Sequence, residues 1–227
     1  MLKIEKTEVV GWEAAIRGMR NPLNSWEKSD SDREWPDCGA CPDEWRPFHV
    51  GSNDLDLMTR LRNAGTDHRK FMRMLIVYLD ITAPLYWWKE FDTYKVGTVA
   101  NSCSTMHKIA DKEFTLEDFS CEHLDIRTRK IVDEIIKALN DYRNLYVNYN
   151  ADDFEIKGCP SKKDIWWQMI QLLPSSYNQK RTVMLNYEVL ANIYKSRRHH
   201  KLDDWHTFCD WIEGLPYSEL ITGKEKK

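Results

Sequence analysis

The segment from Thr82 to His107, TAPLYWWKEFDTYKVGTVANSCSTMH, concentrates side chains that could bind and polarise a small polar ligand. It follows a strongly apolar run and carries more polar and aromatic groups than a hydrophobic core requires. The candidates are Tyr86, Trp87, Trp88, Lys89, Glu90, Asp92, Tyr94, Asn101, Ser102, Ser104 and His107. A buried strand that leads into a ligand-facing helix and loop would produce this pattern.

A second candidate for chemistry is the pair Cys38 and Cys41, whose CxxC spacing suits a zinc knuckle or a redox dithiol. Zinc needs a second pair of ligands, and His49 alone lies nearby. The other cysteines are scattered singly, at Cys103, Cys121, Cys159 and Cys209. We therefore expect reduced loop thiols and no metal site, with a small zinc-binding module as an alternative.

The run RRHHK at residues 197–201 places positive charge at the end of a predicted helix. Such a cluster complements a helix C-terminus, and it could also hold a phosphate. Adjacent helical residues point about 100° apart, so His199 and His200 are poorly placed to share a metal ion. Phosphate-loop, dinucleotide-fold, serine-hydrolase and zinc-protease motifs do not occur in the sequence.

Composition excludes several broad classes of partner. The 227 residues carry 33 basic and 36 acidic side chains, a net charge of −3, so no global field favours nucleic acid or an anionic membrane. The mean hydropathy is −0.64, and no apolar run approaches the roughly 20 residues that span a bilayer. The start, MLKIEKTEVV, lacks the apolar stretch of a signal peptide. These features predict a cytoplasmic protein without a membrane or nucleic-acid partner.

The elements that would position the candidate residues follow from periodicity and capping signals. Strands are predicted at residues 2–10, 74–81 and 182–185, where apolar residues alternate or run together. Helices are predicted at residues 12–19, 52–63, 85–95, 127–149, 187–198 and 205–213, with a further helix after Ser161 and a helical turn at 67–73. Capping is expected from Thr115, Ser161 and one of residues 52–54.

The segment at residues 21–51 contains four prolines and little periodicity, which predicts an irregular loop or lid. The chain length suits one domain over residues 1–227, with a disordered tail at about residues 222–227. The abundance of tryptophan, 10 residues, suits a core or an oligomer interface.

Two groups of residues resemble motifs of the flavin-dependent thymidylate synthases. LMTRLRNAG (57–65), MLIVYLDI and PLYWWKEFDTYK occupy the places of a helix ending in Ala-Gly, a strand and a helix in that family. NSCSTMH (101–107) is similar to the end of the signature R-H-R-x-x-S-x-N-E-x-S-x-R-Y, with Asn101 and Ser104 matching. Near the C-terminus, Asn186, Leu190 and Arg197 match the spacing of N-x-R-x-L and the Leu-Arg that follows.

The resemblance implies an α/β (α+β) fold with a central antiparallel or mixed sheet flanked by helices. It implies that Lys95, Asn101 and His107 line an FAD pocket, and it also implies binding of a nucleotide such as dUMP through the residues Ser104, Asn186 and Arg197. A homotetramer that transfers a one-carbon unit to dUMP with reduced flavin would follow. No residue is assigned as catalytic.

The sequence departs from the family in two places. Neither Tyr94-Lys95-Val96 nor Phe91-Asp92-Thr93 supplies the R-H-R that grips flavin phosphates and nucleotide in the family, and Glu188 replaces the arginine of N-x-R-x-L. Losing a charge-assisted bond costs roughly 1.5–3 kcal/mol. The alternative is therefore an inactive binding or assembly protein that kept the scaffold.

Overall fold

The computed structural model describes residues 2–33, 48–150 and 160–224. Its strands are β1 (Lys3–Val10), β2 (Asp32–Arg33), β3 (Phe48–His49), β4 (Ile76–Pro84), β5 (Val99–Ser102) and β6 (Asn178–Asn186). Its α-helices are α1 (Trp12–Arg20), α2 (Ser52–Asn63), α3 (Leu85–Phe91), α4 (Thr105–Lys108), α5 (Ile126–Val147), α6 (Lys162–Leu172), α7 (Tyr187–Arg197), α8 (Asp203–Glu213) and α9 (Glu219–Thr222). Short 3-10 helices are η1 (Asn21–Leu23), η2 (Trp26–Lys28), η4 (Arg69–Arg73) and η5 (Leu116–Asp118).

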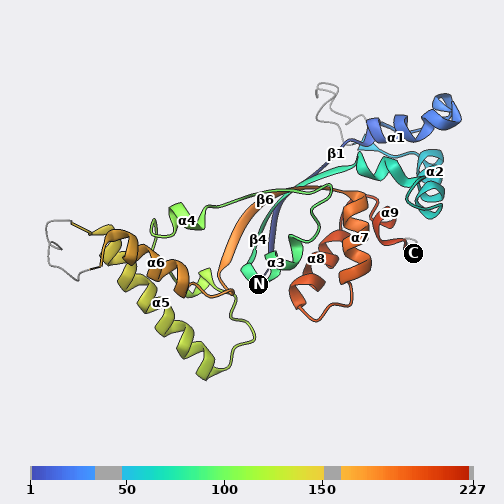
Figure 1. The fold of residues 1–227 in the computed structure, drawn as a ribbon. Coiled ribbons are helices and arrows are strands. Elements are labelled where there is room, and N and C mark those ends of the chain that lie inside the picture. The colour runs from blue at the N-terminus through green and yellow to red at the C-terminus, as the bar shows by residue number, and fades with distance from the viewer. Residues whose placement is uncertain (1, 34–47, 151–159, 225–227) are drawn as a thin grey trace, which may run out of the picture. The chain divides into compact units, whose positions relative to one another are not determined.

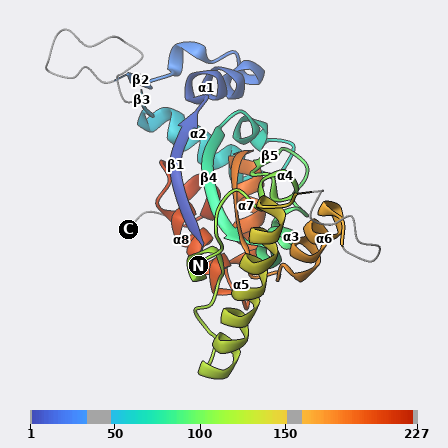
Figure 2. The same cartoon turned by 90° about the vertical axis from the view of Figure 1, so that its left-hand side faces the viewer.

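Four strands form an antiparallel sheet in the order β1-β4-β6-β5 (Figures 1 and 2). The mixed α/β class predicted from the sequence is confirmed. Strand β4 begins at Ile76, inside the apolar run at residues 74–81 that was expected to form a buried strand. Instead, Val77, Leu79 and Ile81 are buried on one face, while Tyr78 is exposed on the other. Alternation of side chains along a strand explains the difference.

The described chain groups into two compact units. Unit 1 consists of Met1–Glu5, Asp80–Thr93 and Ala100–Thr182, and unit 2 consists of Lys6–Leu79, Tyr94–Val99 and Val183–Lys227. Strands β1, β4, β5 and β6 each contribute residues to both units. Because these strands are shared, the single domain expected from the length stays a prediction.

In unit 1, helices α5 and α6 pack side by side (Figures 1 and 2). The caps predicted at Thr115 and Ser161 are both present, and each forms a capping box. Ile131 on α5 is 55% exposed, whereas its neighbour Val132 is buried. The core that these helices cover is made of Ile109, Ala110, Phe114, Phe119, Cys121, Val132, Leu139 and Met169.

In unit 2, α7 contacts α8, α9 and η4. The core of unit 2 contains fully buried aromatic side chains, including Tyr187, Trp205 and Phe208. Gly214 ends α8, as its position in the sequence predicts. The tail expected at residues 222–227 falls partly within the described chain, where α9 ends at Thr222 and Lys224 forms an ion pair with Glu213 at 2.8 Å.

The described parts of the predicted loop at residues 21–51 contain η1, η2, β2 and β3, and β2 pairs antiparallel with β3. Helix α2 begins at the predicted residue, but none of residues 52–54 caps it through its own side chain. The Asp30 carboxylate caps it instead, accepting the backbone N–H groups of Asn53 at 2.9 Å and Asp54 at 3.1 Å. Residues 34–47 lie outside the described chain, so the lid stays a prediction.

Three elements differ in extent from the expectation. Helix α3 ends at Phe91 and not near residue 95, and β6 begins at Asn178, four residues before the predicted start. Asn101 and Ser102 belong to strand β5, in a segment where a ligand-facing helix and loop were expected. Polar strand ends such as Asn178-Gln179-Lys180 carry no apolar alternation, so periodicity alone does not find them.

Candidate ligand-binding site

A cavity of about 380 Å³ in unit 1 is lined by Ser104, one of the residues predicted to bind substrate. Ser104 is the N-cap of α4, and its Oγ accepts the backbone N–H of His107 at 3.1 Å. The buried Gln179 amide holds the preceding turn, because its Nε2 donates to the Cys103 carbonyl at 3.0 Å and to Thr105 Oγ1 at 3.3 Å. The hydroxyl proton of Ser104 can still donate to a ligand.

Lysines from three places line the same cavity, and each of them has a carboxylate partner. Lys180 pairs with Asp80 at 3.1 Å and Lys108 with Asp111 at 3.0 Å. Lys112 pairs with Asp118, and this hydrogen bond raises the pKa of the lysine. The cavity is therefore polar and charged but carries no large excess of positive charge.

Arg181, on β6 in unit 1, contacts Phe91-Asp92-Thr93, one of the two segments compared with the R-H-R signature. Its Nη1 donates to Asp92 Oδ1 at 2.7 Å, and its Cζ lies 4.1 Å from the ring centroid of Trp88. Its Nε donates to Gln179 Oε1 at 3.0 Å. Sequence reasoning missed Arg181, since its partner Asp92 lies far away in the chain and no local pattern links them.

In unit 2, the segment Tyr94–Val99 lies against α7 and α8. The Arg197 guanidinium, at the end of α7, donates from Nε to the Tyr94 hydroxyl at 2.9 Å. Its Cζ also lies 4.8 Å from the ring centroid of Trp205, within the range of cation–π attraction. Tyr94 and Trp205 thus fix the orientation of Arg197, the residue that matches the Leu-Arg of the flavin-dependent thymidylate synthases.

Asn186, the third residue predicted to bind substrate, caps α7. It is buried, and its Oδ1 accepts the backbone N–H of Val189 at 3.0 Å. A Cβ added to Gly97 would lie 2.8 Å from Asn186 Nδ2, and Gly97 has a φ of +78°, which favours glycine. An Asn before an apolar helix is a recognisable capping signal, and this capping role alone accounts for the residue.

The structure separates the six predicted residues into two groups. Asn101, Ser104 and His107 belong to unit 1, and all three are exposed. Lys95, Asn186 and Arg197 belong to unit 2, where Lys95 is exposed two residues before Gly97. The ligand-binding roles of all six stay predictions.

Glu188, which stands where the family motif has an arginine, binds two arginines in unit 2. Its carboxylate pairs with Arg69 at 3.2 Å and also with Arg73. Burial alone would raise the pKa of Glu188, but the hydrogen bonds from Arg73 and Arg69 lower it below its ordinary value. Glu188 is thus an ionised partner of basic residues and cannot replace a phosphate-binding guanidinium.

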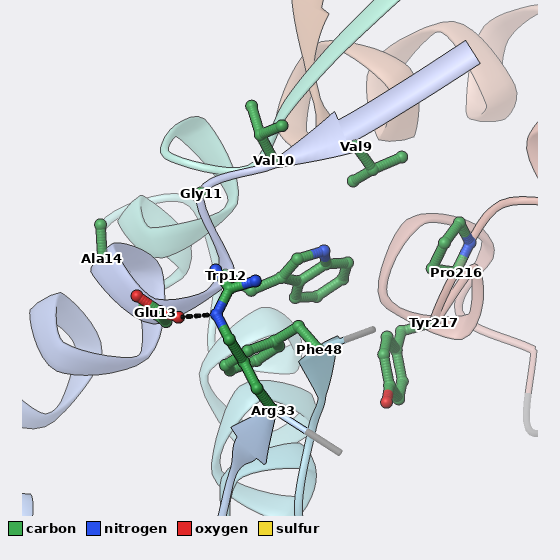
Figure 3. Close-up of a pocket in the computed structure, with 10 residues that line it drawn as sticks. All are labelled: Val9, Val10, Gly11, Trp12, Glu13, Ala14, Arg33, Phe48, Pro216 and Tyr217. Atoms are coloured by element: carbon green, nitrogen blue, oxygen red, sulfur yellow. Dashed lines mark hydrogen bonds and ion pairs between the residues drawn. The ribbon is translucent and has the colours of Figure 1, made fainter. Parts of the chain in front are cut away.

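Another cavity of unit 2, of about 600 Å³, has no predicted site residue in its wall (Figure 3). The rings of Trp12 and Tyr217 approach edge to face at 5.1 Å, and Phe48 and the ion pair of Arg33 with Glu13 lie beside them. Arg33 and Phe48 flank residues 34–47, which are outside the described chain. We assign no ligand to this cavity.

Within residues 2–33, 48–150 and 160–224, no group of His, Cys, Asp and Glu could hold a metal ion. Cys38, Cys41 and Cys159 lie outside these ranges, so the zinc alternative stays a prediction. Cys103, Cys121 and Cys209 are free thiols, and burial raises the pKa of Cys209 to about 11. None of the described helices combines the length and apolar character needed to cross a membrane.

The fold is that of the flavin-dependent thymidylate synthases, which confirms the resemblance seen in the sequence at the level of the fold. No protein-family model and no curated protein matches the chain. The likeness is therefore one of structure.

Two solved structures of the flavin-dependent thymidylate synthase ThyX from Helicobacter pylori, both with FAD and dUMP, show this fold. One superimposes with a TM-score of 0.64 and 15% identity, covering 99% of this chain and 100% of that chain. The other has a TM-score of 0.63 and 15% identity, covering 98% of each chain.

Proposed function

We propose that this chain is a nucleotide-binding protein whose ligand is a nucleoside monophosphate such as dUMP. The observation that carries the proposal is Arg197, whose guanidinium is oriented by Tyr94 and Trp205 at the place of the family's Leu-Arg. A guanidinium held in one orientation loses little conformational freedom when it binds a phosphate. The structural similarity to two dUMP-bound enzymes supports the same ligand class.

Ser104, in unit 1, is proposed separately as a hydroxyl donor to a ligand phosphate. Its position is fixed by the bond that its Oγ accepts from His107 N, and it lines a cavity. Asn101, His107 and Lys95 would contribute further polar contacts to the ligand or to a cofactor. Asn186 would act indirectly, by fixing the start of the helix that ends at Arg197.

The finer hypothesis is one-carbon transfer to dUMP with reduced flavin, which requires FAD to bind. A bound reduced flavin would supply the hydride. The residues present do not fit the FAD diphosphate as the signature's arginines would, because Arg181 is paired with Asp92 and Lys95 is a single exposed cation. We therefore derive no catalytic step through flavin for this chain.

The alternative is a protein that binds or assembles without catalysis, and Glu188 favours it. An ionised carboxylate bound to Arg69 and Arg73 takes the place of an arginine in the family motif. The guanidinium that the family motif would provide at this position is therefore absent. A homo-oligomer, a tetramer by resemblance, is proposed for either function.

The absorbance spectrum of the purified protein, followed by titrations with dUMP and FAD, separates these hypotheses. Flavin bands together with dUMP binding would support the synthase. Binding of dUMP without flavin would support the nucleotide-binding function alone. If neither ligand binds at about 10 µM, an affinity worth ~7 kcal/mol, the nucleotide proposal is wrong and the assembly alternative remains.

A further inference from the structure

A cavity of about 640 Å³ in unit 2 has a strongly cationic wall. It lies among α2, η4, α7 and α9, elements that contact one another within this unit (Figure 1). Six basic side chains reach it, and none of the residues that line it is acidic. The six are Arg62, Arg69, Lys195, Arg198, His199 and Lys224.

Three of these groups have no carboxylate partner in the described part of the chain. Lys195 lies on α7 and His199 lies just after it. Both side chains are exposed and line the cavity, and neither forms an ion pair with a described residue. Arg62 donates to neutral oxygens, namely Asn63 Oδ1 at 2.9 Å, the Leu220 carbonyl at 3.2 Å and the Ile221 carbonyl at 3.4 Å. Burial and the nearby charge of Arg69 lower the pKa of Arg62.

The other three basic side chains, Arg69, Arg198 and Lys224, contact three carboxylates between them. Glu213 pairs with both Arg198, at 3.5 Å, and Lys224, at 2.8 Å. Arg198 has a second partner in Asp210, whereas Arg69 shares Glu188 with Arg73. The cations around the cavity therefore outnumber the carboxylates that contact them, and an excess of positive charge faces the empty volume.

Repulsion among like charges costs stability unless an anion relieves it, so this arrangement favours an anionic ligand. Guanidinium groups bind phosphate oxygens in pairs, and a lysine adds a mobile point charge. The volume falls in the usual range for small-molecule sites, roughly 300–1,000 Å³. The basic side chains come from several elements around the cavity, among them α2, η4 and α7, which suits an anion with more than one phosphate group.

We propose that this cavity binds a small ligand with two or more linked phosphate groups. The site goes beyond the proposed nucleotide function, because it uses neither Ser104 nor Arg197. It also gives a role to the basic run at residues 197–201, of which Arg198 and His199 line the cavity.

Calorimetric titration of the full chain with inorganic pyrophosphate tests the site. Lys195→Gln should weaken pyrophosphate binding about tenfold, because it removes a charge that no carboxylate offsets. Adding His199→Gln should weaken it further, by about threefold. Both side chains are exposed, so neither variant should disturb the fold. Higher salt should weaken binding to the unmodified chain.

Lys201→Gln is the matched control, since Lys201 is exposed in the same basic run but does not line the cavity. It should change pyrophosphate affinity by less than about twofold, and so should Arg197→Ala, which distinguishes this site from the proposed nucleotide site. Equal losses in Lys195→Gln and Lys201→Gln would show diffuse charge attraction and overturn the proposal. Absence of pyrophosphate binding at about 1 mM would overturn it as well.

Discussion

Arg181 on β6 and Asp92 at the end of α3 form an ion pair, with Nη1 2.7 Å from Oδ1. Asp92 lies in one of the two segments compared with the R-H-R signature of the flavin-dependent thymidylate synthases. A guanidinium is therefore present beside this segment, but it belongs to Arg181 on β6. It stacks on Trp88 and is already bound to a carboxylate. Arg181 and Asp92 thus neutralise each other within the protein, and neither charge requires a ligand.

Replacing Arg181 by Ala should destabilise the protein by about 1–2 kcal/mol, since the cation–π contact with Trp88 and the ion pair are both lost. Asp92→Asn retains the stacked guanidinium and should cost less than about 1 kcal/mol. Urea unfolding of both variants measures the difference. Equal losses would mean that stacking on Trp88 contributes nothing.

The buried pair of Arg20 and Asp54 in unit 2 should make stability depend on pH. Arg20 Nε lies 2.6 Å from Asp54 Oδ1, and the Asp54 side chain is fully buried. Burial raises the pKa of Asp54, but hydrogen bonds from Ser31, Ser29 and Arg20 outweigh it and lower the pKa below 3.8. The stabilisation is therefore present above the unfolded-state pKa and is lost as the pH falls through the folded-state pKa.

Denaturant unfolding at several pH values between about 5 and 2 tests this linkage. Asp54→Ala should destabilise the protein at pH 7 by about 3–5 kcal/mol, because it leaves Arg20 buried without its partner. The loss of stability on acidification should be smaller in Asp54→Asn than in the unmodified chain. Parallel pH profiles would show that Asp54 has the same pKa in both states.

Gly97 and Gly65 form a matched pair of glycines with positive φ, +78° and +107°. A Cβ at Gly97 would meet the Asn186 amide at 2.8 Å, whereas nothing lies within 4 Å of one at Gly65. Gly97→Ala should therefore cost more than Gly65→Ala, which carries only backbone strain of about 1 kcal/mol.

Thermal or urea unfolding of the two glycine variants gives both values. If Gly97 also fixes the start of α7 through Asn186, Gly97→Ala should weaken dUMP binding while Gly65→Ala does not. The same stability loss in both variants would argue against close packing of Gly97 on Asn186.

Local signals in the sequence predicted the elements well. The caps at Thr115 and Ser161 were predicted because their partners lie within four residues of them. Alternation and apolar runs located β1 and β4 for the same reason. The fold class followed from these elements together with the family resemblance.

Contacts between residues far apart in the chain could not be predicted from local sequence signals. The Asp30 carboxylate caps α2 from another segment, and Arg181 reaches Asp92 across a separation of 89 residues. Arg62 and Lys195 reach one cavity from different helices. None of these contacts leaves a periodic signal, because only the folded chain brings the partners together. Asn186 is different, since its position before α7 was a local capping signal.

The most direct test of the nucleotide proposal is calorimetric titration of dUMP into the unmodified chain and two variants. Arg197→Ala should weaken dUMP binding at least tenfold, or about 1.4 kcal/mol, since it removes the oriented guanidinium. Lys201→Ala, an exposed cation of the same basic run, should leave the affinity within about twofold. Unchanged dUMP affinity in Arg197→Ala, or equal losses in both variants, would contradict the central claim.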